Sequence, residues 1–562
     1  MFVWSIFATN LIHSFMLRKR VILFLFSFIL LGLTLNAQED DKGFELSKNL
    51  EIFSSVYKNL HLNYVDDINP GELMKTAIDA MLEKLDPYTN YFPESSIEDV
   101  KLQLMGQYGG IGALIHQQNG NVIISEPYEG LPADKAGLKA GDIIIEVNGQ
   151  EAKGKNSDQV REFLRGQAGS EIKIKVLRDG KEIEKKFHRQ EITLNNVPYY
   201  GMLKNGIGYI KLNEFTKDAA NNVLNAFKTL KKDNNMKGLV LDLRGNGGGL
   251  LNDAVSLVNI FVDKGQNIVS TKGKIAEKNQ TFKTTNSAID LDIPIVVLVD
   301  NSSASASEIV AGSLQDLDRA VIMGQRTYGK GLVQNIIPLI YNAQMKVTVS
   351  KYYIPSGRCI QAIDYSHRDD NGRAIKVPDS LRTAFKTKGG RTVYDGFGIE
   401  PDVFIEPEYA STLGITIITK FLAFDFASQF VKQNPTIPNA KEFKITDEIY
   451  NQFVDFIKDK DYSYSTITEK MLKELKDMSE KEKYSQEIEN TIEDLKAKIE
   501  SDKKNDLIKF KDEIKDILLS EIVVRYYYQK GRIEALLQND TEVEKAINLL
   551  SNQQEYNKIL GK

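Results

Sequence analysis

The sequence predicts a multidomain α/β protein with helical regions at both ends of the chain. Its 562 residues exceed what one hydrophobic core organises and suggest about three or four domains. From about residue 197 onward, strand-like apolar runs alternate with helix-like segments, which is the pattern of a layered α/β core. Beyond about residue 409 the composition is rich in Lys, Glu, Asp and Ile with little Gly or Pro, which indicates helices.

The N-terminal residues have the layout of an export signal. Three basic residues at 18–20 precede an apolar run at 21–35, and Leu-Asn-Ala ends at Ala37. A run of 15 residues is short for a membrane span of about 20. We therefore expect a signal peptide at 1–37, starting at Met1 or Met16, and a mature chain that is periplasmic or extracellular. Contact with the membrane, at the outer face of the inner membrane, is expected only if the signal is retained.

Charge and cysteine content exclude several classes of partner. The 72 Lys and Arg residues against 77 Asp and Glu give a net charge of −5, so the sequence predicts no nucleic-acid binding. The single cysteine, Cys359, excludes an internal disulfide framework, and the five scattered histidines lack zinc-ligand spacing. We expect neither a metal site nor a cofactor.

Four regions follow the signal. Residues 38–98 carry helical spacing broken at Asn69-Pro70-Gly71, which predicts two helices, and 99–191 hold short β-branched runs divided by glycine. Residues 192–408 form the α/β core. Residues 409–562 form a helical extension, in which the apolar spacing from Ile488 to Ile499 lasts only about two heptads and favours a packed hairpin over a long coiled coil.

The stretch "NSSASASEIVAG" at 301–312 follows a strand-like run and opens a helix. Ser305 and Glu308 match the S-x-x-E capping box, which is a purely structural interpretation. A hydroxyl at this place also lies beside unpaired N–H groups and the positive helix end, which favour an oxyanion. The neighbouring serines are interpreted as loop or first-turn residues: Ser302, Ser303 and Ser307.

A nucleophilic Ser305 needs a base, and no histidine lies near it in sequence. The next one, His367, is 62 residues on, whereas "TYGKGLVQ" places Lys330 between two glycines. A neutral lysine is a recognised alternative base, provided that burial without a carboxylate lowers its pKa from about 10.4 toward about 7. Gln334, four residues further, is expected on the same face, where its amide could orient the amine.

Several segments in order resemble one family, the carboxyl-terminal processing, or tail-specific, serine proteases. They are "LDPYTNYF", "GLVLDLRGNGGG", "SASASEIVAGSLQDLDRAVIMGQRTYGKGLVQ" and "KYYIPSGRCIQ", and the resemblance spans about residues 45 to 405. "AGLKAGDIIIEVNG" at 136–149 resembles part of a PDZ domain. The resemblance implies a crotonase-like (ClpP/crotonase-type) protease core at 192–408 and a PDZ-like peptide-binding module at 99–191.

The resemblance also assigns roles to residues. It makes Ser305 the nucleophile, Lys330 the base and Gln334 its support, and it builds an oxyanion hole from backbone N–H groups of Ala306 and of Gly247 or Gly248. Glu308 and Asp316 match positions important in some members, and we interpret both as structural. In the PDZ-like module, backbone N–H groups are expected to bind a C-terminal carboxylate while the peptide adds as a strand: Gly110, Ile111, Gly112 and Ala113. An ordinary turn is the alternative there.

The sequence therefore predicts an endopeptidase that recognises C-terminal tails and cleaves through an acyl-enzyme. Two alternatives stay open: a catalytically silent PDZ-type scaffold that binds protein C-termini, and an acyl-transfer enzyme on a crotonase-like core. Solvated helices explain the extension at 409–562, and the same helices could also support a homo-oligomer.

Overall fold

The computed structural model describes residues 42–94, 107–232, 235–483 and 486–562, and the predicted signal at 1–37 lies outside them. The chain divides into two compact units, at Lys84 and Leu85. The first contains a helix over residues 42–63 and α2 (Pro70–Glu83), as predicted. The side chain of Asn69 caps α2 by accepting from the N–H groups of Gly71 and Glu72.

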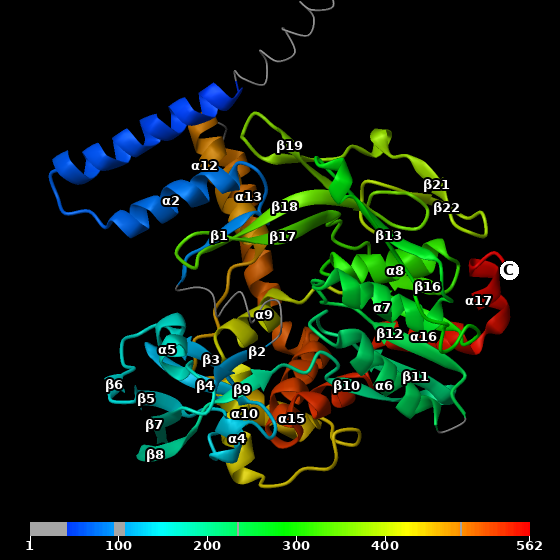
Figure 1. Cartoon of the computed structure of the whole chain (residues 1–562). Helices are drawn as coiled ribbons and strands as arrows, with labels where there is room; N and C mark the ends of the chain where they lie inside the picture. Colours follow the sequence, from blue (N-terminus) through cyan, green and yellow to red (C-terminus); the bar gives the residue numbers. More distant parts are fainter. Residues whose placement is uncertain (1–41, 95–106, 233–234, 484–485) are drawn as a thin grey trace, which may run out of the picture. The chain divides into compact units, whose positions relative to one another are not determined.

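The core of the second unit is a six-stranded sheet (Figure 1). In spatial order its strands are β10 (Tyr199–Met202), β11 (Ile207–Lys211), β12 (Gly238–Asp242), β15 (Ile295–Val299), β16 (Val321–Gly324) and β23 (Val403–Phe404). All neighbours are parallel except β10 and β11. Every residue of β12, β15 and β16 is buried, because helices cover both faces, and this explains their continuous apolar runs.

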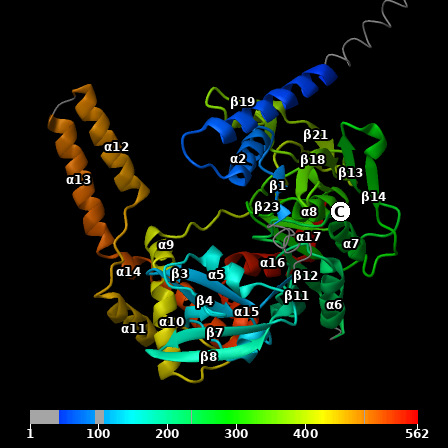
Figure 2. The same cartoon turned by 60° about the vertical axis from the view of Figure 1, so that its left-hand side comes forward.

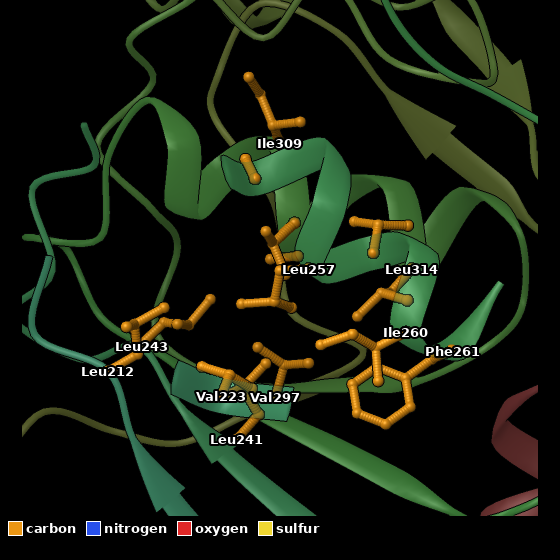
Figure 3. Packing of buried hydrophobic residues seen from close by; sticks show 14 of the residues in the cluster. Leu212, Val223, Leu241, Leu243, Leu257, Ile260, Phe261, Val297, Ile309 and Leu314 are labelled. Carbon is orange, nitrogen blue, oxygen red and sulfur yellow. The ribbon is translucent and has the colours of Figure 1, made fainter. Parts of the chain in front are cut away.

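Two sets of helices cover this sheet. On one face, α6 (Ala219–Lys231), α7 (Leu251–Phe261) and α8 (Ala306–Asp316) pack over strand residues such as Leu241 and Val297 (Figure 3). On the other face, Val240 and Val296 pack against α16 (Thr541–Ser551) and α17 (Gln553–Ile559). The last helices of the chain thus complete the core.

The second unit also contains a separate, antiparallel sheet of five strands. Its order is β1 (Asn90–Phe92), β18 (Gln344–Tyr353), β13 (Asn267–Gly273) and β14 (Gln280–Lys283), and β17 (Leu332–Pro338) also pairs with β18. Two short hairpins follow: β19 (Ile363–Arg368) with β20 (Ala374–Lys376), and β21 (Ala384–Lys386) with β22 (Thr392–Tyr394).

The β-rich module is an insertion whose ends meet. Its antiparallel sheet has the order β3 (Ala113–Gln118), β4 (Asn121–Pro127), β5 (Ile143–Val147), β7 (Glu171–Arg178) and β8 (Lys181–His188), with β6 (Gln150–Glu151) on β5. The helices α4 (Pro132–Lys135) and α5 (Ser157–Leu164) accompany it. The entering strand β2 (Gln107–Gly110) pairs with the leaving strand β9 (Gln190–Thr193).

The remaining C-terminal helices have a core of their own. It joins α9 (Thr412–Thr419), α10 (Leu422–Gln433), α11 (Asp447–Ile457), α14 (Asp506–Lys509) and α15 (Lys511–Leu536). The predicted hairpin is present as α12 (Ile467–Glu482) and α13 (Gln486–Lys503), which run side by side (Figure 2). Within the described ranges, no single helix is long and apolar enough to cross a membrane; only the pair α9 and α10, bent by 60°, meets those criteria together.

Candidate active site

Ser305 lies at the junction of β15 and α8, where it is the residue before the first helical turn. Its backbone has φ 56° and ψ −112°, a conformation that a residue with a side chain adopts at a cost. Its N–H donates to Oε2 of Glu308 at 2.8 Å, so the expected link between these two residues is present. The strained turn leaves the Ser305 side chain half-buried at the wall of a cleft.

The neighbouring serines have structural bonds instead. The Ser303 hydroxyl is buried and donates to the carbonyl of Leu243 at 2.9 Å, and that of Ser307 donates to the carbonyl of Asn246 at 2.9 Å. Ser302 is exposed in the loop. Among these four serines, the cleft wall contains Ser305 alone.

A single buried carboxylate joins the serine to the lysine. Glu308 is fully buried, and its oxygens accept from the N–H groups of Ser305 (2.8 Å), Lys330 (2.9 Å) and Gly329 (2.7 Å) and from the Thr327 hydroxyl (2.6 Å). Burial raises the pKa of Glu308, although the four hydrogen bonds oppose this effect. The carboxylate thereby fixes the backbones of both Ser305 and Lys330 from one point.

Lys330 lies two residues before the start of β17 and lines the same cleft as Ser305. Burial lowers its pKa to about 8, and the charge of Lys346 adds to the effect, whereas Glu308 and Asp86 oppose it. Its Nζ lies 4.2 Å from the centre of the Tyr88 ring. Across the described parts of the chain, no carboxylate forms an ion pair with this amine.

Gln334 also lines the cleft, but simple strand alternation from Lys330 does not place it there. Lys330 precedes the strand, and the register of β17 on β18 shifts between Val333 and Gln334. The amide of Gln334 donates to the hydroxyl of Thr348 on β18 at 3.2 Å. Its orientation is thus fixed by the neighbouring strand.

The loop "RGNGGG" packs directly against the serine. A Cβ atom at Gly248 would lie 2.8 Å from Cβ of Ser305 and 2.9 Å from the N atom of Ala306, so this contact requires glycine. The N–H of Gly248 donates to Oδ1 of Asn246 at 2.9 Å. Within the residues that the structure describes, the N–H groups of Gly247 and Ala306 have no acceptor.

The C-terminal helices fix the start of this loop. The Arg244 guanidinium bonds to Asp242 (2.7 Å) at the end of β12, and to Asp540 (2.7 Å) and Glu542 (2.9 Å) at the start of α16. Burial alone would raise the pKa of Asp242, but Lys211 and Arg244 hold it well below its usual range. The glycine-rich loop therefore begins at a rigid, charged anchor.

The cleft has a volume of about 910 Å³, and several regions of the chain form its walls. The PDZ-like module contributes Glu126, Tyr128 and Leu131, and α15 contributes residues 528–530. Tyr528, with φ 53° and ψ −164°, interrupts α15 at this point. The PDZ-like module and the helical extension thus both reach this cleft.

The four predicted carboxylate-binding residues lie next to this cleft and do not line it. Gly110 ends β2, and Ala113 begins β3. Between them, the carbonyl of Ile111 accepts from Ala133 (2.8 Å) and that of Gly112 from Tyr128 (2.9 Å).

Both carbonyls are therefore used within the module. Over the described ranges, the N–H groups of Ile111 and Gly112 have no acceptor. A Cβ atom at Gly112, where φ is 71°, would lie 2.6 Å from Cβ of Leu131, which is a cleft residue.

Sequence reasoning missed two cleft-side contacts of the lysine. In the sequence, Tyr88 is only one residue of the segment "LDPYTNYF", and no motif assigns a role to Lys346. The Asp86 carboxylate accepts from the N–H groups of Tyr88 and Thr89, both at 2.8 Å, which shapes this segment. The D-P-Y-T turn signal is visible in the sequence, but the contact of Tyr88 with the distant Lys330 is not.

Comparisons with known proteins agree with this geometry. Residues 206–366 match the profile of Peptidase family S41, 123–178 that of the PDZ domain, and 413–550 that of the Probable PDZ-protease, C-terminal helical domain. The Carboxy-terminal-processing protease of Bartonella bacilliformis is 36% identical over 321 residues, which cover 56% of this chain and 73% of that protein. The chain belongs to peptidase family S41. Its predicted multidomain α/β organisation, with peptidase, PDZ and C-terminal helical parts, is confirmed.

Other members of family S41 and solved structures resemble the chain as well. A Probable CtpA-like serine protease of Staphylococcus aureus (strain MRSA252) is 33% identical over 406 residues, 72% of this chain and 70% of that protein. The solved photosystem II D1 C-terminal processing protease is 27% identical and covers 63% of this chain and 92% of its own, with a TM-score of 0.35. The PDZ domain of a Carboxy-Terminal Protease from Vibrio cholerae, solved in complex with peptide, is 31% identical over 16% of this chain and 99% of its own, with a TM-score of 0.15.

Proposed function

We propose that this S41 serine peptidase of the carboxy-terminal processing type cleaves with Ser305 as nucleophile and Lys330 as general base. The observation that carries this proposal is the Glu308 carboxylate, which holds the backbones of both residues at the wall of one cleft. A silent scaffold is not favoured, because it has no need of a half-buried lysine without a counter-ion beside a strained serine.

The proposed reaction has two halves. The Oγ atom of Ser305 attacks the carbonyl carbon of the scissile peptide, and the neutral Lys330 amine takes the hydroxyl proton. The C–N bond then breaks as Lys330 returns that proton to the leaving amine, which leaves an ester on Ser305. A water molecule, deprotonated by Lys330, attacks the ester and releases the new C-terminus, and the proton returns to Oγ.

The depressed pKa of Lys330 makes this base available near neutral pH. With a pKa of about 8, roughly a tenth of the amine is neutral at pH 7 and about half at pH 8. A lysine at its ordinary value of 10.5 would be neutral in less than about one molecule in a thousand at pH 7. Gln334, held by Thr348, supports the amine as a neutral neighbour that does not restore its charge.

We assign the oxyanion hole to the N–H groups of Ala306 and Gly247. Both are free of acceptors within the described chain, whereas the N–H of Gly248 already donates to Asn246. Gly248 has a different part, because its missing side chain lets the loop approach Ser305. Donors fixed before the substrate arrives stabilise the developing oxyanion without reorganisation.

Tail recognition is assigned to the PDZ domain. The free N–H groups of Ile111 and Gly112, flanked by Gly110 and Ala113, would bind a C-terminal carboxylate, and the peptide would extend along the edge of β3. β3 pairs with β4 on one side and is the end strand of the described sheet. Its other edge is therefore available to pair with a peptide strand. Gly112 contacts Leu131 of the cleft, which gives a short route from tail binding to cleavage.

The wider organisation is part of the same proposal. It comprises a signal peptide at 1–37, a helical region at 38–98, the PDZ domain at 99–191, a crotonase-like protease core at 192–408 and a helical region at 409–562. The basic and apolar layout of residues 18–35 supports export to the periplasm or the cell exterior.

Cleavage of an unfolded protein tests the dyad. Ser305→Ala and Lys330→Ala should each abolish the appearance of fragments from casein, while the purified variants keep their thermal midpoints. Ser302→Ala, which changes an exposed loop serine that does not line the cleft, should cleave as the native chain does. Fragments produced by either dyad variant would refute the proposal, and their absence with the native chain would support a scaffold.

A further inference from the structure

The Lys330 amine lies over the ring of Tyr88. Nζ lies 4.2 Å from the ring centre, within the range of a cation–π contact. The ring is held from its edge, because its hydroxyl donates to that of Tyr328 (3.3 Å) and accepts from that of Tyr365 (3.4 Å). Its own chain segment is also fixed, since the Thr89 hydroxyl lies 3.4 Å from that of Thr348 on β18.

Within the described residues, the charged groups around Lys330 form no ion pair with its amine. Asp86 and Glu308 favour its charged form at a distance, but Asp86 accepts from N–H groups of its own turn and Glu308 accepts four hydrogen bonds. Lys346 on β18 adds a like charge. The charged groups that act on the amine are therefore one like charge and two carboxylates that already accept other hydrogen bonds.

Burial keeps the hydroxyl groups of Tyr88 and Tyr352 protonated. Burial raises the pKa of Tyr88 far above 10, and burial likewise raises that of Tyr352, whose hydroxyl donates to the Lys330 carbonyl at 2.7 Å. A phenolate counter-ion is thereby excluded as the partner of Lys330. The negative face of the Tyr88 ring is what the amine meets.

We propose that Tyr88 is a positioning residue for the general base: its ring face holds the Lys330 amine in place and stabilises the ammonium that forms when Lys330 takes the Ser305 proton. This inference rests on the proposed Ser305 and Lys330 dyad. A base must be neutral before the attack and cationic after it. A paired carboxylate would keep lysine protonated throughout, whereas a ring face supplies a weaker attraction that leaves the neutral form accessible.

Three variants separate the ring face from packing and from the hydroxyl network. Tyr88→Phe keeps the face and removes the bonds to Tyr328 and Tyr365, while Tyr88→Leu keeps an apolar side chain and removes the face. Tyr353→Leu is the matched control, because Tyr353 faces Lys272 at 4.5 Å on the same sheet.

The readout is the pH profile of kcat/KM with fluorescently labelled casein, whose acid limb reports the base in the free enzyme. In Tyr88→Leu, the acid limb should move to lower pH by about half to one unit, and kcat/KM at the plateau should fall about tenfold. In Tyr88→Phe and Tyr353→Leu, kcat/KM should stay within about threefold of the native value, and the acid limb should not move. Tyr88→Met, which also lacks a ring, repeats the test if Tyr88→Leu has a lowered thermal midpoint.

Other outcomes overturn the inference. A loss of rate with an unmoved limb would show that Tyr88 only packs, and a limb at higher pH would show that it only excludes water. If Tyr88→Leu and Tyr88→Met had the kinetics of the native chain, Tyr88 would have no role in the reaction. The dyad is tested separately, because activity in Lys330→Ala refutes the base itself, whereas an inactive Lys330→Ala beside a native-like Tyr88→Leu refutes only the role of the ring.

Discussion

The half-buried Lys330 should lower the stability of the protein, and replacing it should restore that stability while abolishing cleavage. Lys330→Met in a Ser305→Ala background, which prevents self-digestion, isolates the effect. The methionine retains most of the buried chain of Lys330 and removes the charge. Most substitutions in a well-packed site destabilise, so a gain would be diagnostic of a function that opposes stability.

The magnitude follows from the pKa. Lys330 has a pKa of about 8 in the folded protein against an ordinary value of 10.5, which corresponds to about 3 kcal/mol at about 1.4 kcal/mol per pKa unit. Because the folded state binds this proton less tightly, the cost is fully present below pH 8. It declines as the pH rises from about 8 and vanishes above about 10.5, where the unfolded lysine is also neutral.

Urea unfolding at pH 6.5 and pH 10.5 measures this difference. Near pH 6.5 the Lys330→Met variant should exceed its parent by up to about 3 kcal/mol, and the gap should close toward pH 10.5. Lys274→Met, at an exposed lysine, should leave the free energy of unfolding of the parent unchanged at both pH values. A variant less stable than its parent at pH 6.5, or a gap independent of pH, would refute the depressed pKa of Lys330.

Three further predictions concern the groups around the cleft. Glu308→Gln should lower kcat by at least about a hundredfold and reduce the thermal midpoint, because an amide cannot accept the four bonds that the carboxylate accepts; near-native kcat would contradict its positioning role. Glu542→Gln, which weakens the anchor of Arg244, should lower kcat about tenfold with little change in KM, and a change confined to KM would argue against an effect on the oxyanion loop. Gly112→Ala should weaken the binding of a fluorescent C-terminal peptide by at least about tenfold, whereas Gly120→Ala, with nearly the same φ but open space around it, should not; equal effects would mean that backbone strain alone is responsible.

The strand-like runs of the sequence predicted the parallel core and also β17 and β18 of the antiparallel sheet, but not β13 or β14. β12 and β15 are buried on both faces, so their apolar runs are continuous and recognisable. β13 lies between β18 and β14, and its adjacent buried residues Ile268 and Val269 break the period-2 pattern that would have distinguished a strand from a loop. The roles of α16 and α17 were also hidden, because an amphipathic helix does not reveal which sheet it covers.

Within the site, the residue types that do chemistry were predictable and their neighbours were not. The lack of a nearby histidine predicted Lys330 as the base, and the start of a helix predicted Ser305 as the nucleophile. The distinction between Gly247 and Gly248 depends on one hydrogen bond to Asn246, which two adjacent glycines cannot disclose in sequence. The contact with Tyr88 depends on long-range pairing of β1 with β18, so no local pattern could reveal it.

Trapping the covalent intermediate tests the central claim most directly. The native chain is incubated with casein, quenched in acid during turnover, digested and analysed by mass spectrometry for acylated peptides. The proposed mechanism predicts a substrate-derived acyl group on Ser305, on none of Ser302, Ser303 or Ser307, and its absence in Lys330→Ala. Acylation at another residue, or cleavage by the native chain with no acyl-enzyme on Ser305 at any quench time, would contradict it.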